Sequence, residues 1–272
     1  MTSSISQPAP AETVAIGIGG TTVRLHSSDS HFRSMVRERY CSFLAGSADA
    51  DFDFDIELLE RPSENTDDDV QVQVRNDEWL MRRGDFDACW STNSRRGTVR
   101  QANSSYATDS VLRIVHSIAL AQRGGFLMHA ASAIRNGKAF LFAGVSGAGK
   151  TTISRLAPTD CVLLSDEISY VRPHGKTYVA YGTPFSGELG KPGENRCAPV
   201  ETVFLLEKGP SHHIEAVPDV DAVRRLLRNI LFFAEDASLV HMVFQSACEF
   251  AQSVPIKKLV FKPEQSVWDM IR

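Results

Sequence analysis

The sequence predicts an α/β protein, in which a phosphate-binding-loop domain with a mixed sheet follows a smaller strand-rich α+β domain. The stretch GVSGAGKTT at 144–152 fits the pattern G-x-x-x-x-G-K-[ST] of loops that hold phosphate groups. An apolar run of strand length at 138–143 precedes it, and a short helical stretch at 151–157 follows. This is the strand–loop–helix context that the pattern requires. In the first half of the chain, short alternating segments separated by turn residues indicate strands.

Residues 1–11 are rich in Ser, Pro and Ala and are expected to form a disordered tail before a first domain at 12–107. Within that domain Gly19-Gly20 predicts a hairpin turn, and the alternation of apolar and acidic residues at 52–58 predicts a half-buried strand. The elements expected here are strands at 13–18 and 22–26, a helix at 30–44, the strand at 52–58, a polar loop at 65–69, and a meander of strands at 70–74, 79–83, 86–90 and 98–101.

A connecting helix is predicted within 108–125, because apolar residues recur on one side of 109–123 and Gly124-Gly125 follows. The second domain then covers 126–272. Its expected elements are strands at 126–134, 138–143, 161–165, 168–172, 177–180, 201–207, 214–217 and 256–261, and helices at 151–157, 220–233, 236–253 and 265–271.

Composition excludes several classes of function. The chain has 272 residues and a formal net charge of −4 without a basic tract, which argues against nucleic acid as a partner. No apolar run is long enough to span a bilayer, so no membrane partner is expected. The five cysteines are scattered and form no C-x-x-C pair, which indicates neither a zinc site nor a disulfide framework. A reducing cytoplasm fits this pattern best.

The loop residues suit a nucleotide triphosphate and Mg²⁺. Glycines allow a tight turn whose N–H groups point at phosphate oxygens. Lys150 would reach the β- and γ-phosphates, and the hydroxyl of Thr151 would bind Mg²⁺. The residues predicted to bind the ATP phosphates are Gly144, Ser146, Gly147, Ala148, Gly149, Lys150, Thr151 and Thr152.

Two further signals lie on either side of the loop. Asp166 and Glu167 end an apolar strand, sixteen and seventeen residues after Lys150, where a carboxylate can hold Mg²⁺ or accept a proton. The alternative is that either acid caps a turn. His129 lies on an apolar strand twenty-one residues before Lys150 and is either a core histidine or a site residue.

Taken together, His129, the loop at 144–152 and the acids at 166–167 resemble HPr kinase/phosphorylase, and the loop is also similar to that of ATP-dependent phosphoenolpyruvate carboxykinase. The resemblance covers about 126–208 and implies a P-loop kinase domain of that type. It departs from the family in having Glu rather than Asp at Glu167, and in a loop-to-acid spacing one residue shorter.

The resemblance implies roles for single residues. His129 would lie near the transferred phosphate, Asp166 would hold Mg²⁺, and Glu167 would act as base toward the acceptor serine. Glu188, in a loop with Gly and Pro, is similar in order to a further Mg²⁺ ligand of the family, or is a plain turn acid. Catalysis would then rest on Lys150, Glu167, Asp166 and His129, and Mg²⁺ binding on Thr151, Asp166 and Glu188.

The function expected is therefore an ATP- and Mg²⁺-dependent phosphotransferase that phosphorylates a serine on a protein or peptide. Because the family forms hexamers, a homo-oligomer is left open. One alternative is an ATP-binding sensor or assembly module without transfer activity, and a second is a carboxykinase-type enzyme on a small metabolite. Lys191 and Arg196 are either solvated loop cations or contacts to phosphate or to the acceptor.

Overall fold

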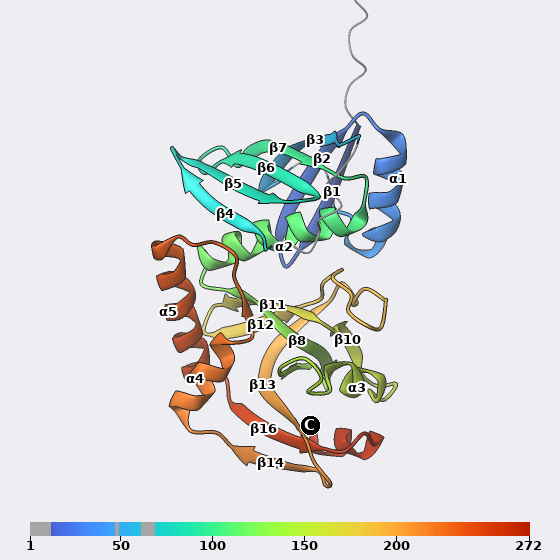
Figure 1. The fold of residues 1–272 in the computed structure, drawn as a ribbon. Coiled ribbons are helices and arrows are strands. Elements are labelled where there is room, and N and C mark those ends of the chain that lie inside the picture. Colours follow the sequence, from blue (N-terminus) through green and yellow to red (C-terminus); the bar gives the residue numbers. More distant parts are fainter. Residues whose placement is uncertain (1–11, 47–48, 61–68) are drawn as a thin grey trace, which may run out of the picture. The chain divides into compact units, whose positions relative to one another are not determined.

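The computed structural model describes residues 12–46, 49–60 and 69–272 (Figure 1). It is a mixed α/β protein, mostly strands, with two mixed sheets. The chain divides into two compact units, one of Met1–Gly17 and Thr22–Thr108, the other of Ile18–Thr21 and Asp109–Arg272. The expected tail at 1–11 and all but the last residue of the expected loop at 65–69 lie outside the described residues.

The first unit contains a sheet whose described strands follow the order β1-β2-β3-β7-β6-β5-β4. The alternation of β3 gives it a buried row at Phe52 and Phe54. β3 pairs in parallel with both β2 and β7, whereas β4, β5, β6 and β7 form an antiparallel meander. The elements are β1 (Glu12–Ile18), β2 (Thr21–Ser27), α1 (Ser30–Arg39), β3 (Phe52–Leu58), β4 (Gln71–Arg75), β5 (Glu78–Arg83), β6 (Phe86–Ser91) and β7 (Arg96–Gln101). Helix α2 (Ser105–Ala121) follows and belongs to the second unit from Asp109 on.

In the second unit two long strands each pair with several partners. The first half of β8 (Phe126–Arg135) pairs with β11 and its second half with β9, while β13 (Cys197–Lys208) pairs first with β12 and then with β9 and β16. The other elements are β9 (Lys138–Ala143), α3 (Lys150–Arg155), β10 (Val162–Ser165), β11 (Ile168–His174), β12 (Thr177–Tyr181), β14 (His213–Ala216), α4 (Asp219–Leu227), β15 (Ile230–Leu231), α5 (Ala237–Ser253) and β16 (Ile256–Phe261).

The strands β9, β13 and β16 are parallel neighbours, so their carboxyl ends meet at one edge of the sheet. Both faces of this part are buried, which explains the continuous apolar run at 138–143. Leu141 of β9 packs on the side of α4 and α5, whereas Phe140 and Phe142 pack on the side of Ile153 and Trp268. Loops at the carboxyl edge of parallel strands are the usual place for a ligand in such sheets.

Several helices differ from the sequence expectations, and three of the differences have a clear form. The helix expected at 30–44 ends at Arg39, and a 3-10 turn at Cys41–Phe43 follows. The helix expected at 220–233 ends at Leu227, because the next residues pair with the first half of β8: Ile230 opposes Met128 and Leu231 opposes Leu127. This pairing satisfies backbone groups that β8 would otherwise leave unbonded in the interior. The expected terminal helix is a 3-10 helix at Gln265–Met270.

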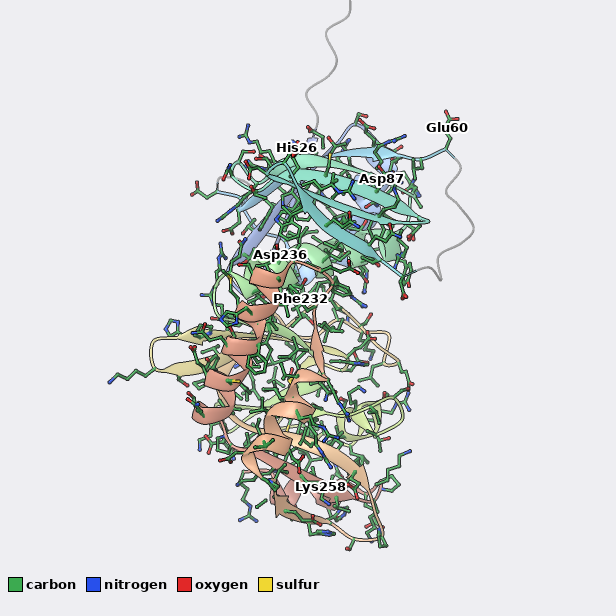
Figure 2. All side chains as sticks on the ribbon, turned by 60° about the vertical axis from the view of Figure 1, so that its left-hand side comes forward. His26, Glu60, Asp87, Phe232, Asp236 and Lys258 are labelled. Carbon is green, nitrogen blue, oxygen red and sulfur yellow. The ribbon has the colours of Figure 1, made fainter. Side chains whose placement is uncertain are left out.

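Helix α5 begins where its sequence predicts. The side chain of Asp236, labelled in Figure 2, accepts a hydrogen bond from the backbone N–H of Leu239 at 2.8 Å and so caps the helix. On the face toward the sheet, Phe250 is fully buried. None of the helices in the described ranges combines the length and the apolar character that crossing a membrane would require.

Candidate functional site

A cavity of about 330 Å³ lies where the loop after β9 meets the end of β13. It gathers residues from five separate stretches of the chain. The lining consists of His129, Ser146, Gly147, Gly149, Lys150, Thr151, Thr152, Arg155, Asp166, Glu167, Gly187, Glu188 and Lys208. Its volume is at the lower end of the range for small-molecule sites, about 300–1,000 Å³.

Strand register explains why these stretches meet. His129 of β8 pairs with Ile168 of β11, so Glu167 directly precedes the residue opposite the histidine. The next residue of β8, Ala130, pairs with Ala143, the last residue of β9, after which the loop begins. The histidine, the acid and the glycine-rich loop are therefore brought together by neighbouring strands at one edge.

The loop takes a conformation that only glycine adopts readily at two positions. Gly147 and Gly149 have φ angles of 76° and 112°. A Cβ at Gly149 would lie 2.7 Å from the ring of Phe261, whereas one at Gly147 would meet nothing within 4 Å. The backbone N–H of Ala148 donates to the carbonyl of Val145 at 3.0 Å, which closes the turn.

Lys150 is held inside the loop. Its ammonium group donates to the carbonyl of Gly144 at 2.8 Å and approaches that of Val145 at 3.4 Å. Burial lowers the pKa of Lys150, and the nearby charges of Glu167 and Glu188 oppose that shift. The ammonium group is thus a partly desolvated point charge at the cavity wall, where its attraction for an anion is stronger than in water.

Asp166 is buried and fastens the loop that follows β12. One carboxylate oxygen accepts from the N–H of Gly187 at 2.8 Å and the other from the N–H of Leu189 at 2.9 Å. Glu188 lies between these two anchored residues and so reaches the cavity lining. Gly187 must be glycine here, since a Cβ would lie 2.9 Å from the Cβ of Glu167. Asp166 therefore has a structural role that its sequence context did not predict.

Glu167 is half-buried in the turn between β10 and β11. The hydroxyl of Ser165 accepts hydrogen bonds from the N–H groups of Glu167 and Ile168 at 3.1 and 2.8 Å and holds that turn. Burial raises the pKa of the Glu167 carboxyl group; Arg113 counteracts this effect. A carboxylate whose pKa is raised toward neutrality is a better proton acceptor than one at its ordinary value.

Arg113, on α2, does not line the cavity but contacts the lining residue Glu167, and sequence reasoning missed it. Its Nη2 lies 3.5 Å from Oε2 of Glu167, and its guanidinium carbon lies 5.2 Å from the centre of the Phe185 ring. Its Nε is buried without a hydrogen-bond partner among the described residues. The available signal was a single arginine in a run of α2 that is otherwise almost entirely apolar, from Val111 to Ala121.

His129 lies in the cavity in a partly buried position. Burial lowers its pKa, and the positive charges of Lys150 and Arg113 lower it further. Its backbone N–H donates to the carbonyl of Asn229, at the end of α4, at 2.6 Å. The imidazole is therefore biased toward its neutral form, in which one nitrogen donates and the other accepts a hydrogen bond.

Most of the residues that the sequence predicted as a site are brought together, with two exceptions in the loop. Gly144 and Ala148 do not line the cavity: Gly144 supplies a carbonyl to Lys150, and Ala148 packs against the apolar core. Arg155 and Lys208 are additional cations on the lining. Lys191 and Arg196 instead line a second cavity, next to the first.

The donors present are compatible with a hard divalent cation. Thr151, Asp166 and Glu188 offer oxygen atoms, which Mg²⁺ prefers, and Mg²⁺ usually takes only one or two carboxylates together with phosphate oxygens and water. Within the described ranges no cluster of three or more His, Cys, Asp or Glu residues could hold a metal by itself.

Comparison with known proteins changes the family assignment. The model of the family described as SynChlorMet cassette protein ScmC matches residues 100–272, more than half of the chain. No curated protein matches. The expected membership of the HPr kinase/phosphorylase family is wrong, because the match is to ScmC and no match to the HPr kinase family was found. The residues behind that resemblance form short motifs, and such motifs recur without identifying a family. The chain belongs to the ScmC family of SynChlorMet cassette proteins.

Proposed function

We propose that this protein is an ATP- and Mg²⁺-dependent phosphotransferase that phosphorylates a serine hydroxyl on a protein or peptide, with its second unit acting as a P-loop kinase-type domain. One observation carries the proposal. A single cavity is lined by the glycine-rich loop, by Lys150, and by a half-buried acid, Glu167, beside a partly buried histidine, His129.

The loop supports binding of a triphosphate. Its turn is closed by Ala148 and made possible by glycines, and Lys150, Arg155 and Lys208 supply positive charge. These groups would orient the γ-phosphate and offset the charge that its transfer spreads over the phosphate oxygens. For phosphoryl transfer, such positioning and charge stabilisation make up most of the catalysis.

Thr151, Asp166 and Glu188 are the residues that would hold Mg²⁺, with Asp166 also retaining its bonds to the loop. When bound, the ion would neutralise charge on the phosphate oxygens. Glu188 is the most exposed of the three and the one whose position depends on Asp166, through the anchored amides on either side of it.

Glu167 is the group that would take the proton of the acceptor. In the transfer, the serine oxygen forms a bond to the γ-phosphorus, the bond between that phosphorus and the bridging oxygen breaks, and ADP leaves with the electron pair. The hydroxyl proton passes to the Glu167 carboxylate. Arg113 keeps that carboxylate in place from the side of α2, and neutral His129 can donate a hydrogen bond to the phosphoryl group.

A second candidate function is favoured by the geometry of Asp166. Both oxygens of Asp166 already accept backbone hydrogen bonds, so the carboxylate holds the loop in place. A metal ion would have to bind it alongside these hydrogen bonds. A protein that binds ATP and changes the position of the 183–196 loop without transferring phosphate would use the same contacts. This is the sensor or assembly module.

The decisive experiment measures ATP binding and phosphate transfer separately. ATP·Mg²⁺ at a hundred times its Kd should stabilise the wild type by about 2.7 kcal/mol. Lys150→Ala should remove that stabilisation, whereas Lys176→Ala, a change of an exposed lysine in the β11–β12 turn, should leave it intact. If Lys150→Ala is stabilised as strongly as the wild type, the proposed site is wrong.

Transfer is tested with γ-labelled ATP and pools of serine-containing peptides. Glu167→Gln should retain nucleotide-dependent stabilisation and lose labelling of the peptides, because the amide cannot accept the hydroxyl proton. Strong ATP binding together with no labelling of any pool by the wild type would favour the sensor function. Normal labelling by Glu167→Gln would exclude the role assigned to this glutamate.

A further inference from the structure

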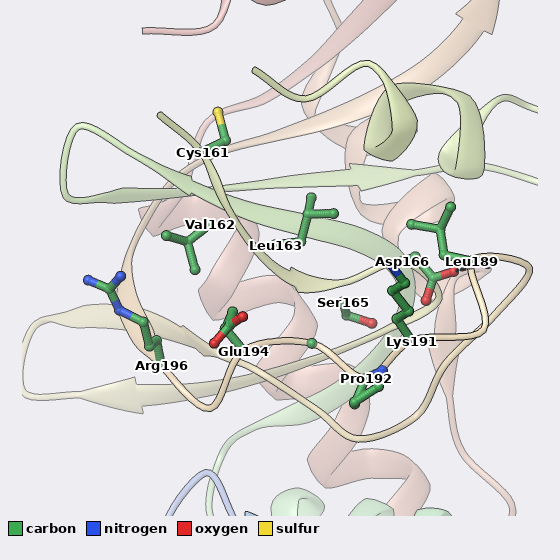
Figure 3. Close-up of a pocket in the computed structure, with 11 residues that line it drawn as sticks. Cys161, Val162, Leu163, Ser165, Asp166, Leu189, Lys191, Pro192, Glu194 and Arg196 are labelled. Carbon is green, nitrogen blue, oxygen red and sulfur yellow. Dashed lines mark hydrogen bonds between the residues drawn. The ribbon is translucent and has the colours of Figure 1, made fainter. Parts of the chain in front are cut away.

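A second cavity, of about 490 Å³, adjoins the first. It lies between β10 and the segment from Leu189 to Arg196 that arches past that strand (Figure 3). Asp166 lines both cavities and is the residue that they share. Whatever occupies the second cavity therefore contacts Asp166, which is also part of the lining of the first.

The segment from Leu189 to Arg196, here called the arch, is fastened at both ends, so the cavity is preformed. At one end the N–H of Leu189 donates to Asp166. At the other, the N–H of Glu194 donates to the carbonyl of Leu163 at 2.9 Å, and Gly193 packs so closely that a Cβ would lie 1.7 Å from the carbonyl oxygen of Leu164. A preformed cavity lowers the ordering cost of binding.

The lining combines an apolar floor with cations. Val162, Leu163, Leu189 and Pro192 supply apolar surface. Lys191 and Arg196 are exposed, and neither side chain forms an ion pair within the part of the chain that the structure describes. Figure 3 draws Lys191 at the Asp166 end and Arg196 at the opposite end. The cations flank the floor at both ends, which suits an elongated ligand with an apolar centre.

Acidic groups on the lining weaken this positive character without cancelling it. Glu194 is an exposed acid, but the carboxylate of Asp166 is buried and occupied by two backbone N–H groups. Cys161 adds no charge, because burial and the neighbouring Asp160 raise the pKa of its thiol to about 11. The exposed charge on the lining is thus two cations against one carboxylate.

We propose that this second cavity binds the phosphate acceptor as an extended peptide segment, with an apolar side chain on the floor and acidic side chains at Lys191 and Arg196. The proposal rests on the proposed function, since it places the acceptor serine at the shared wall beside Glu167. The cavity selects peptides in which the serine is flanked by acidic and apolar residues, and it disfavours basic flanks.

The test uses the full chain without nucleotide and three fluorescent pools of undecapeptides with a central serine. Their flanking positions carry an apolar residue together with Asp and Glu, with Lys and Arg, or with Gln. Fluorescence anisotropy should give about tenfold tighter binding for the acidic pool than for the basic pool, since each exposed ion pair adds only a modest attraction. The double variant Lys191→Glu, Arg196→Glu should reverse this preference.

The control variant is Lys176→Glu, which makes one such charge reversal, half that of the double variant, at a lysine that lines neither cavity. It should bind all pools as the wild type does. The double variant should keep ATP-dependent stabilisation, which shows that it is folded, because neither substituted residue lines the first cavity. Should it lose that stabilisation, Lys191→Gln and Arg196→Gln, made one at a time, replace it and must each weaken binding of the acidic pool.

The inference is overturned if no pool binds, if acidic and basic pools bind equally, or if the charge reversal leaves the preference unchanged. These outcomes are separate from failure of the proposed function. Binding is measured without ATP. A preference for acidic peptides without any phosphate transfer would therefore contradict the proposed transfer activity but support the peptide-binding role of the second cavity. Peptide labelling that does not change when Lys191 and Arg196 are substituted would contradict the peptide-binding role of the second cavity but support the proposed transfer.

Discussion

Replacement of Asp166 by alanine should loosen the part of the loop around Gly187 and Leu189, while Glu194 stays bonded to Leu163. The change removes two hydrogen bonds of 2.8 and 2.9 Å from a buried carboxylate to the N–H groups of Gly187 and Leu189. Leaving a buried donor without a partner costs about 1–3 kcal/mol, and two donors lose their partner here. Water that reaches the loop can bind these donors and so recovers part of the cost. We expect local opening to become easier by about 2–4 kcal/mol. Asp166→Asn, which keeps one acceptor, should fall between the wild type and alanine.

Amide hydrogen exchange measures this opening directly. A change of about 2–4 kcal/mol corresponds to exchange about 30- to 1,000-fold faster at Gly187 and Leu189, with little change in β9 or β13. Asp160→Ala is the matched control, because that acid is exposed and forms a surface ion pair with Arg135 at 3.1 Å. It should change exchange in the loop less than about threefold. If Asp166→Ala leaves exchange at 183–196 within the same limit, Asp166 does not fasten the loop.

Three further predictions concern the first cavity. Gly149→Ala would place a Cβ 2.7 Å from the ring of Phe261 at a φ of 112°, so it should lower the free energy of unfolding by at least about 2 kcal/mol. Gly147→Ala, whose Cβ would have open space, should lower it by about 1 kcal/mol. Equal losses of the two variants in denaturant unfolding would contradict this reasoning. Because folding lowers the pKa of His129 from 6.5, the unfolded state binds more protons, and the stability of the folded protein falls as the pH drops below about 6.5. His129→Gln should lose less stability than the wild type between about pH 7.5 and 5, as measured by denaturant titration. If the proposed phosphate transfer takes place, Arg113→Gln should raise the pKa of Glu167 and move the acid limb of the transfer rate to higher pH, with Arg113→Lys shifting it less. A pH profile unchanged by both variants would show that Arg113 does not act on Glu167.

Much of the candidate site could be predicted because its signals are local. The loop at 144–152 is contiguous, and its glycines are required where φ is positive, so the residue pattern and the backbone conformation are read from the same nine residues. The strand before it and the helix after it are likewise neighbours in sequence. The length of α3 was overestimated by two residues at its end, since helix ends depend on contacts beyond the helix.

The remaining parts of the site come from long-range contacts. Lys208, the last residue of β13, lies more than fifty residues after the loop, and Arg113 lies on a helix well before it. Nothing in the sequence near Asp166 shows that its carboxylate meets the amides of Gly187 and Leu189. Such contacts depend on how strands pair, which hydrophobic alternation within one strand does not specify.

The fold shows the same division. Alternation in 52–58 identified a strand, but its parallel pairing with β2 and β7 follows only from the assembled sheet. The periodicity at 220–233 favoured one helix, and pairing of Ile230 and Leu231 with β8 ended it early. Tertiary hydrogen bonds outweighed local helix propensity there, because a half-paired interior strand is less stable than a shortened helix.

By itself the sequence determined a glycine-bearing loop with one lysine between an apolar strand and a helix, because backbone conformation at glycine and the charge of a side chain are properties of the residues themselves. Only the tertiary structure decided that His129 and Glu167 face this loop, that Arg113 supports the glutamate, and that Asp166 holds a neighbouring arch in place. The physical reason is register: hydrogen bonding between strands distant in the chain sets which side chains meet, and that pairing is settled only when the whole sheet has formed.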